Sequence, residues 1–487
     1  MSAPGDPHPP PVLRNAIWLI GAQVLGAPIS VLINVVAGRY LGPAEFGTLY
    51  LAMTYSSFAL LFVEWGQFGA LTGKIAGHRA RAGELLGSAM LWRIAASSAV
   101  AVIVLLLCAA VGYGRSFLSV MALALAAAGL GTVAAAGQDA VRGFERTDFA
   151  ALSYVGQQLL VAGVSITVLL LGFGLRGLLL GQILCATIGV MFVLWMLPRL
   201  QISNLSVRYE TIKELVRDGR AFLVFVLVLQ LQPLVDGAMM SRFASADAIG
   251  WYAASRKLVG ALMFPVSAVG SALYPTLVRQ FANDMPGFGA TVRSALNGLC
   301  LIVFPLALGC VLFPHLGVMI FNSHTFAPAE QNLRLLGVYL FLLYFSIPLS
   351  QCITSTGRQA RWTAVQCLCV VISAVADPLL IPWFEVHAGN GGLGVCVAAV
   401  GSEILMVFGA VLLVPKGVLD ASLLRMFVKP ALGGLAMAAV GLWVGRYSEL
   451  LGAILAVLAY ALVLWLTGAL NAQVLRTALA AMRRRRA

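Results

Sequence analysis

Two nine-residue stretches, RYLGPAEFG (Arg39–Gly47) and RFASADAIG (Arg242–Gly250), follow the same pattern. Each begins with an arginine and an aromatic residue, passes through small residues with one acid, and ends with an apolar residue and a glycine. A long apolar segment ends just before each arginine, and another begins at each final pair. A repeated hairpin in a chain of apolar segments is typical of a transporter built from two related bundles.

The composition is that of an integral membrane protein. Hydrophobic residues make up 60% of the chain and charged residues 10%, against about 25% charged residues in a soluble domain. Fourteen apolar runs are long enough to cross about 30 Å of hydrocarbon as helices. They lie at 13–37, 46–71, 84–110, 115–138, 149–172, 175–197, 219–241, 249–275, 289–312, 332–354, 362–383, 391–414, 424–445 and 449–470, with a kink expected at Pro265. Because the loops between them are short, we expect an all-α polytopic membrane protein without a soluble catalytic domain.

The spacing of the repeat predicts the organisation of the chain. Six helices separate the two hairpins, and an even number preserves orientation, so the lobes are expected to be parallel copies. A second, weaker repeat supports this organisation. Gly143-Phe-Glu-Arg precedes the fifth predicted helix, and Gly357-Arg-Gln-Ala-Arg precedes the eleventh. We predict a six-helix lobe at 1–198, a cytoplasmic amphipathic linker at 199–219, a second six-helix lobe at 220–415, and a helix pair with a basic tail at 416–487.

The charge distribution predicts the topology. The net charge is +13, and with a cytoplasmic N-terminus most of the 32 Lys and Arg residues fall on the cytoplasmic side, as the positive-inside rule describes. An even number of helices returns the Arg483–Arg486 tail to the cytoplasm, where it suits anionic lipid rather than nucleic acid. The first eleven residues, MSAPGDPHPPP, lack the features of a removable signal peptide.

Three stretches carry a family resemblance. They are GRYLGPAEFGTLYLAM from Gly38, LVDGAMMSRFASADAIGWYAASRKL from Leu234 and FNSHTFAPAEQNLRLL from Phe321. They resemble the first hairpin, the seventh-to-eighth helix hairpin and the periplasmic start of the tenth helix of Wzx-type polysaccharide-repeat-unit flippases. Those proteins belong to the multidrug/oligosaccharidyl-lipid/polysaccharide exporter superfamily, with the lipid II flippases and the multidrug-cation antiporters.

The resemblance implies a function and a location. It implies alternating access that carries an undecaprenyl-diphosphate-linked oligosaccharide from the cytoplasmic to the periplasmic leaflet of a bacterial inner membrane. The product would serve exopolysaccharide, capsule or O-antigen synthesis. The implied partners are this lipid-linked substrate, membrane lipid, and a polysaccharide polymerase with a chain-length regulator.

A diphosphate headgroup that crosses the hydrocarbon core of a bilayer requires a water-filled cavity with cations that bind it. The positive-inside bias disfavours cations on the predicted outer side, and four of the eight that lie there belong to the two hairpin copies and the helix after the second: Arg39, Arg242, Arg256 and Lys257. Arg39 and Arg242 each follow a predicted helix end. There a cation also stabilises the last carbonyl groups, so helix capping competes with headgroup binding as their role.

Arg256 and Lys257 lie about 9–10 Å into the eighth helix, counted from Gly250. The corresponding residues of the first copy are Met53 and Thr54, so the two lobes have diverged at this level. Neighbouring helix residues point about 100° apart, so one of the two cations is expected to face the cavity. In the resembling family the matching helix lines the cavity. Headgroup binding by Arg256 and snorkelling to the interface are both open.

Intramembrane acids and amides are the candidates for ion coupling. Asp236 follows Gln232 on the seventh helix and is expected to face the cavity, where it pairs with Arg256, exchanges an ion, or forms a structural ion pair. Glu64 near the end of the second helix lies either in the cavity or at headgroup level. Glu403, in the middle of its helix, must find a partner or be protonated. For Arg93 we expect snorkelling to the cytoplasmic surface.

Other functions fit the residues less well. A multidrug-cation exporter requires an acidic and aromatic cavity, which Arg256 and Lys257 oppose, whereas a lipid II flippase shares the need for cations. The longest outer loop, 313–331, has no recognisable catalytic spacing, so we expect no enzyme and no catalytic residues. The eight cysteines form no Cys-x-x-Cys pair and match no zinc spacing, so no metal or cofactor is expected.

Overall fold

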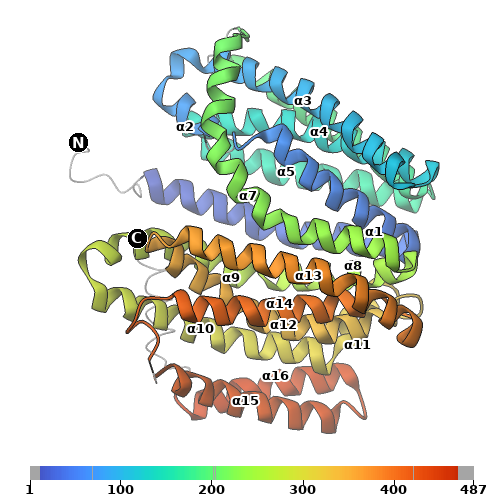
Figure 1. The fold of residues 1–487 in the computed structure, drawn as a ribbon, viewed down its shortest axis with the longest axis vertical. Helices are drawn as coiled ribbons and strands as arrows, with labels where there is room; N and C mark the ends of the chain where they lie inside the picture. Colours follow the sequence, from blue (N-terminus) through green and yellow to red (C-terminus); the bar gives the residue numbers. More distant parts are fainter. Residues whose placement is uncertain (1–10, 68–69, 201, 203, 421, 470–487) are drawn as a thin grey trace. The chain divides into compact units, whose positions relative to one another are not determined.

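The computed structural model describes residues 11–67, 70–200, 202, 204–420 and 422–469, which form an all-α protein (Figure 1). Its compact units are Pro10–Arg242 and a unit that begins at Phe243. The first contains α1 Pro11–Glu64, α2 Ala70–Gly77, α3 Ala82–Val111, α4 Arg115–Gly143, α5 Thr147–Leu170, α6 Gly174–Met196 and α7 Tyr209–Phe243. The second contains α8 Ala246–Leu262, α9 Phe264–Asn283, α10 Met285–Leu312, α11 Pro314–Asn322, α12 Ala329–Ser355, α13 Gln359–Ala388, α14 Gly392–Leu413, α15 Ser422–Val444 and α16 Glu449–Leu466.

The predicted fold class is confirmed, whereas the number of spans is not. Eleven helices of the described residues are long and apolar enough to cross a membrane, or up to twelve if the bent pair α8–α9 is one span. We expected about fourteen. The first two predicted runs form the single element α1. The expected kink is present, because α8 and α9 meet at 47° with Pro265 in the first turn of α9.

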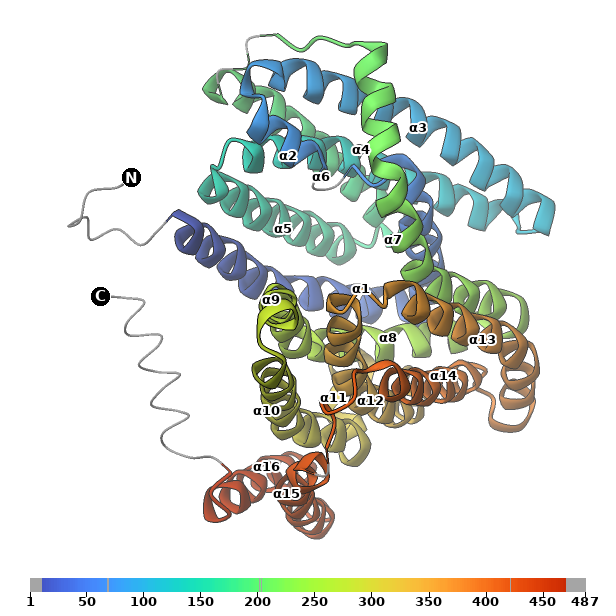
Figure 2. The same cartoon turned by 60° about the vertical axis from the view of Figure 1, so that its left-hand side comes forward.

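The two units use the same helix contacts. In the first unit α4 packs on α3 and α6, and α5 packs on α6. In the second unit α12 packs on α10 and α14, and α13 packs on α14. The additional pair α15–α16 packs together, as Figure 2 shows, and α15 also contacts α10. The repeated contacts agree with two related bundles, while the predicted lobe and linker boundaries stay predictions.

The repeated hairpin breaks both helices at equivalent positions. In the first copy Gly42 has φ 73° and ψ 173°, a conformation that suits glycine, and it interrupts α1 just before Pro43. In the second copy Ser245, three residues after Arg242 as Gly42 is after Arg39, caps α8. The chain therefore bends at the same residue of each copy.

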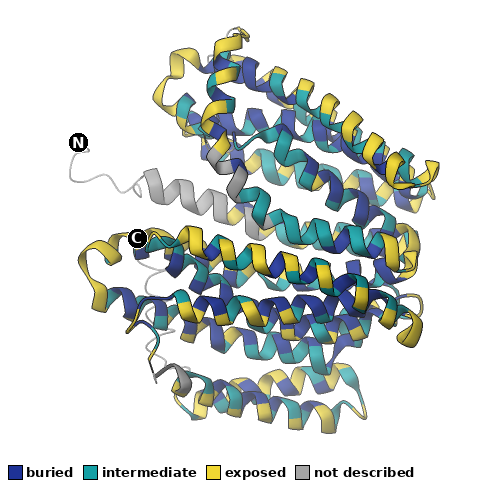
Figure 3. Ribbon diagram, in the orientation of Figure 1, coloured by how far each residue is buried: buried dark blue, intermediate teal, exposed yellow. Residues whose placement is uncertain are grey.

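The surfaces of several helices are apolar. α3 lies in the candidate span with the highest mean hydropathy, yet only 6% of the span's most apolar window is buried (Figure 3). Large apolar side chains of this helix, such as Leu106 and Leu107, are exposed. An apolar surface of this extent suits lipid and not water.

α7 is held along the first unit at both ends. Near its beginning, Trp65 Nε1 donates a hydrogen bond to the Val216 carbonyl at 3.1 Å. A Cβ atom on Gly219 would lie 1.9 Å from the Trp65 carbonyl oxygen, so this contact requires glycine. Near its end, Gly237 lies beside Thr54 of α1. α7 therefore contacts α1 near its end and the residue that follows α1 near its beginning.

Candidate functional site

The two cations of α8 differ in their surroundings. α8 begins after Ser245, whose hydroxyl accepts a hydrogen bond from the Ala248 amide at 3.3 Å. Arg256 is half-buried; its Nη2 donates to the Tyr339 hydroxyl at 3.4 Å, and its guanidinium carbon lies 4.9 Å from the centre of that ring. This is a cation–π arrangement. Lys257 is exposed, so Arg256 is the cation that packs into the unit.

Glu403 lies close to this arginine in the second unit. Its side chain is on α14, which packs on α8 and α12, and the residue is 5% exposed. It hydrogen bonds with Ser346 and interacts electrostatically with Arg256. Its other oxygen, Oε1, is buried without a hydrogen-bond partner in the described part of the chain. The buried carboxyl group thus has Ser346 as its hydrogen-bond partner and Arg256 as a positive charge that acts on it.

The predicted polar stripe lies on α7 in the first unit. Asp236 is 7% exposed and Gln232 is half-buried. Arg256 belongs to the other unit, so the pairing of Asp236 with Arg256 and the cavity exposure of Gln232 stay predictions.

The hairpin arginines are both exposed. Arg39 lies three residues before the break at Gly42, and Arg242 is the basic residue in the last turn of α7. These positions fit the helix-end role, and headgroup contact by either residue stays a prediction.

A cluster of hydroxyl groups, missed by the sequence analysis, holds the end of α7. The Tyr55 hydroxyl lies 2.8 Å from that of Tyr113 and 3.2 Å from Ser241 Oγ, and Tyr113 also hydrogen bonds with Ser241. Phe117 stacks on Tyr113 with ring centres 4.5 Å apart. The cluster joins α1, the turn before α4 and α7, one residue before Arg242.

A buried ion-pair cluster contradicts one expectation. Arg93 does not snorkel: it is 1% exposed, because its Nη1 donates to the Thr132 carbonyl at 2.6 Å and its Nη2 lies 3.3 Å from Asp139 Oδ2. Arg142 Nη1 lies 3.4 Å from the other oxygen of Asp139. Glu64 is half-buried and interacts electrostatically with Arg93 and Asp139. Its neighbourhood is therefore a charge-balanced cluster inside the first unit.

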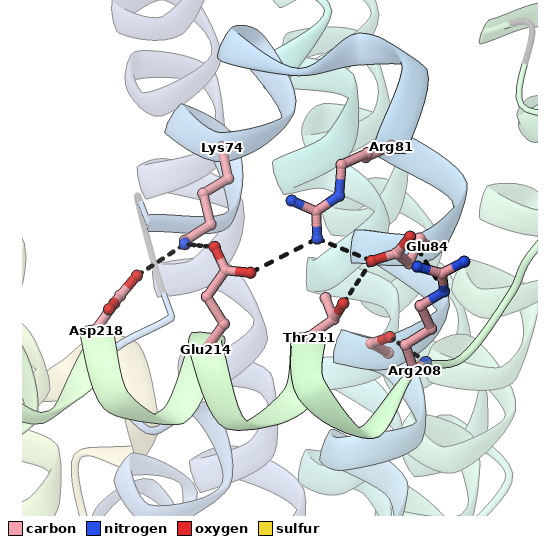
Figure 4. A network of polar contacts seen from close by, with 8 residues as sticks. Lys74, Arg81, Glu84, Arg208, Thr211, Glu214 and Asp218 are labelled. Carbon is pink, nitrogen blue, oxygen red and sulfur yellow. Dashed lines mark hydrogen bonds and ion pairs between the residues drawn. The ribbon is translucent and has the colours of Figure 1, made fainter.

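A second ion-pair network fastens the beginning of α7 to α2 and α3 (Figure 4). Lys74 of α2 pairs with Glu214 and lies 2.7 Å from Asp218 Oδ2. Arg81 lies 2.8 Å from Glu84 and 3.6 Å from Glu214. The network thus joins α7 to a segment more than a hundred residues earlier in the chain.

The ion-pair network lies outside the membrane-spanning segments, and it shifts the pKa values of its members. The hydrogen bonds from Lys74 lower the pKa values of Glu214 and Asp218. Partial burial opposes the charge of Lys74, but the hydrogen bonds to Asp218 and Glu214 outweigh it and raise the pKa of Lys74. All three groups are therefore held in their charged forms at neutral pH.

The predicted outer loop contains one ion pair. His315 Nδ1 lies 2.9 Å from Glu330 Oε1, and this hydrogen bond raises the pKa of His315. Within the described residues, no group of three or more His, Cys, Asp or Glu side chains is placed to hold a metal ion. All eight cysteines are free, and Cys367 is the exposed one.

Comparison with known proteins adds a family and a fold. A family model described as polysaccharide biosynthesis protein matches residues 12–281, more than half of the chain. No curated protein sequence matches the chain.

Solved structures show a shared fold. The lipid II flippase MurJ, in an inward closed conformation, has a TM-score of 0.68 at 14% identity and covers 95% of this chain and 99% of its own. An inward-facing multidrug resistance MATE family transporter of the MOP (multidrug/oligosaccharidyl-lipid/polysaccharide) superfamily has a TM-score of 0.67 at 14% identity and covers 83% and 98%. A MOP superfamily transporter from Pyrococcus furiosus, described as having reverse polarity of its binding pocket, has a TM-score of 0.53 at 15% identity and covers 82% and 94%. The chain therefore has the fold of this superfamily.

Proposed function

Because the chain belongs to the polysaccharide biosynthesis protein family, we propose that it is a flippase for lipid-linked oligosaccharides. The substrate class is an undecaprenyl-diphosphate-linked repeat unit, which moves from the cytoplasmic to the periplasmic leaflet of a bacterial inner membrane. Both termini lie in the cytoplasm. Two lobes rock about a cationic central cavity, and the product serves surface polysaccharide synthesis. A polymerase and chain-length regulator are its proposed partners, on the Wzx-type resemblance alone.

The observation that carries the proposal is Arg256. A permanently charged side chain is costly in an apolar bundle and marks a substrate or ion pathway by default. Arg256 is half-buried and rests on Tyr339, with a planar fork of donors that suits a phosphate. An anionic headgroup leaving an inside-negative cell gains about 2.3 kcal/mol per charge per 100 mV if net charge moves.

Lipid II is the second candidate substrate. The shared fold with the lipid II flippase MurJ extends over 95% of this chain, whereas that with the multidrug transporter covers 83%. Lipid II also presents a diphosphate, so Arg256 serves either substrate. The family match favours the polysaccharide unit.

The test locates the lipid-linked oligosaccharide in a deletion strain with a probe that cannot cross the membrane. Wild type should relieve accumulation on the inner face, and Arg256→Ala should not. Arg334→Ala removes an exposed arginine of α12 and should behave as wild type. Normal outer-face display in the deletion strain would refute an essential role in flipping this glycan.

A further inference from the structure

We infer that the headgroup site is also a proton site, in which Glu403 takes up a proton when a diphosphate docks on Arg256. The inference rests on the proposed function, because it needs an anionic headgroup at Arg256. It adds a coupling that neither the family nor the shared fold assigns to this chain.

The geometry places both groups in one packed core. α8, α12 and α14 pack on one another, and they contribute Arg256, Tyr339 with Ser346, and Glu403. Tyr339 fixes one side of the guanidinium through its hydroxyl and its ring. Glu403 interacts with the same guanidinium from α14. Arg256 is therefore both the cation whose charge acts on the buried carboxylate and the candidate ligand of a phosphate.

Glu403 is incompletely satisfied as a carboxylate. Its Oε1 is buried without a hydrogen-bond partner in the part of the chain described, and Ser346 is its hydrogen-bond partner. A carboxylate oxygen buried without a donor is costly, whereas a protonated carboxyl group is not charged. The charge of Glu403 thus depends on how closely Arg256 is engaged with it.

The other groups that face Glu403 do not replace Arg256. From α13 it meets Cys369, an electrostatic neighbour without positive charge. Asp377 lies one turn beyond Ser373, which hydrogen bonds with Ser402, the residue before Glu403. From α12 it meets Ser346, and on α8 Lys257 is exposed. Arg256 is the cation that this neighbourhood supplies among the described residues.

The linkage follows from competition for that cation. A diphosphate that docks on Arg256 engages the guanidinium and places negative charge near Glu403, so the carboxylate binds a proton from water. One O–H bond forms on Glu403, and the bond from that proton to hydronium or to a buffer acid breaks. By reciprocity, a proton on Glu403 releases Arg256 for the phosphate and strengthens headgroup binding.

The experiment counts protons on binding. Purified full-length protein is titrated calorimetrically with undecaprenyl diphosphate in two buffers of different ionisation heat at one pH. Protons of the probe itself are the same for every variant, so the difference between variants is the readout. Wild type should take up more protons than Glu403→Gln, by up to about one per bound lipid. For each unit decrease in pH, the Kd of wild type should then fall by up to about tenfold more than the Kd of Glu403→Gln.

Controls separate the possible failures. Glu210→Gln removes an exposed acid of α7 and should keep the wild-type proton count. Glu403→Asp keeps a titratable group and should retain part of the proton uptake. This variant tests the linkage even if Glu403→Gln fails to fold. Equal proton counts in wild type and Glu403→Gln, with both binding the lipid, would overturn the linkage alone. No binding of undecaprenyl diphosphate by wild type would overturn the proposed headgroup site and the linkage together.

Discussion

Replacement of Arg93 by methionine tests the buried ion-pair cluster. The change keeps an apolar side chain in the site but leaves Asp139, whose side chain is 4% exposed, without its closest cation. Removing one partner of a buried ion pair costs about 3–5 kcal/mol. Arg142 stays 3.4 Å from Asp139 Oδ1 and offsets part of the loss, so we expect about 3 kcal/mol. For a unit the size of Pro10–Arg242 this lowers Tm by about 6–12 °C.

The assay is thermal unfolding in detergent micelles, followed by tryptophan fluorescence. Arg79→Met is the matched control, because Arg79 lies 3.3 Å from Glu145, the same distance as Arg93 from Asp139, but the two side chains are 53% and 73% exposed. Such a surface pair contributes at most about 1 kcal/mol. The double variant Arg93→Met with Asp139→Leu should recover more than half of the lost Tm, since the carboxylate that lies 3.3 Å from Arg93 is then removed as well. Equal Tm values for Arg93→Met and Arg79→Met would refute the reasoning.

Three further predictions follow from the site and the fold. Arg256→Ala should weaken undecaprenyl diphosphate binding by about tenfold or more, because a lost hydrogen bond to a charged group costs about 1.5–3 kcal/mol. Lys257→Ala should weaken binding far less. Calorimetry measures the Kd of both variants. Lys74→Met should lower Tm at neutral pH, and its effect should disappear as pH falls through the lowered pKa of Glu214, because that carboxylate stabilises the fold only while ionised. Gly42→Ala should cost about 1–3 kcal/mol in thermal unfolding through backbone strain alone, since a Cβ there meets nothing within 4 Å.

Each of these predictions has its own control. Arg256→Lys keeps the charge and should bind better than Arg256→Ala; equal Kd values for wild type and Arg256→Ala would contradict the headgroup site. Lys213→Met removes an exposed cation of α7 and should leave Tm unchanged, so an equal loss in both lysine variants would speak against the network. Gly73→Ala lies inside α2 with open space around it and should not destabilise; the Gly42 prediction fails if both variants behave alike.

The hairpin repeat could be predicted because its signal is local. Arg39 and Arg242 each precede a helix break, at Gly42 and Ser245, whose residue types are typical of turns and helix caps. The apolar segments on either side of each break are long. Turn residues and helix length are properties of the sequence neighbourhood, so they can be read without knowing any tertiary contact.

The partners of charged residues could not be predicted in this way. Arg93 meets Asp139, 46 residues away, and Lys74 meets Glu214, 140 residues away. The position of Arg93 near a helix end suggested snorkelling, because the acid on α4 that neutralises it becomes a neighbour only when α3 packs on α4. Asp139 itself, an acid at the end of an apolar run, was the available signal. Likewise Glu403, which interacts electrostatically with Arg256, lies 147 positions later in the chain.

Leaflet exchange in proteoliposomes measures directly whether the protein moves a lipid-linked oligosaccharide across the bilayer. The purified protein is reconstituted with a fluorescent undecaprenyl-diphosphate-linked oligosaccharide, and a reductant that cannot cross the membrane bleaches the outer leaflet. With wild type we expect bleaching to reach the whole pool of probe, and we expect Arg256→Ala to slow the second phase. Bleaching with wild type that stops at the outer-leaflet fraction, as in protein-free vesicles, would rule out flipping of this probe.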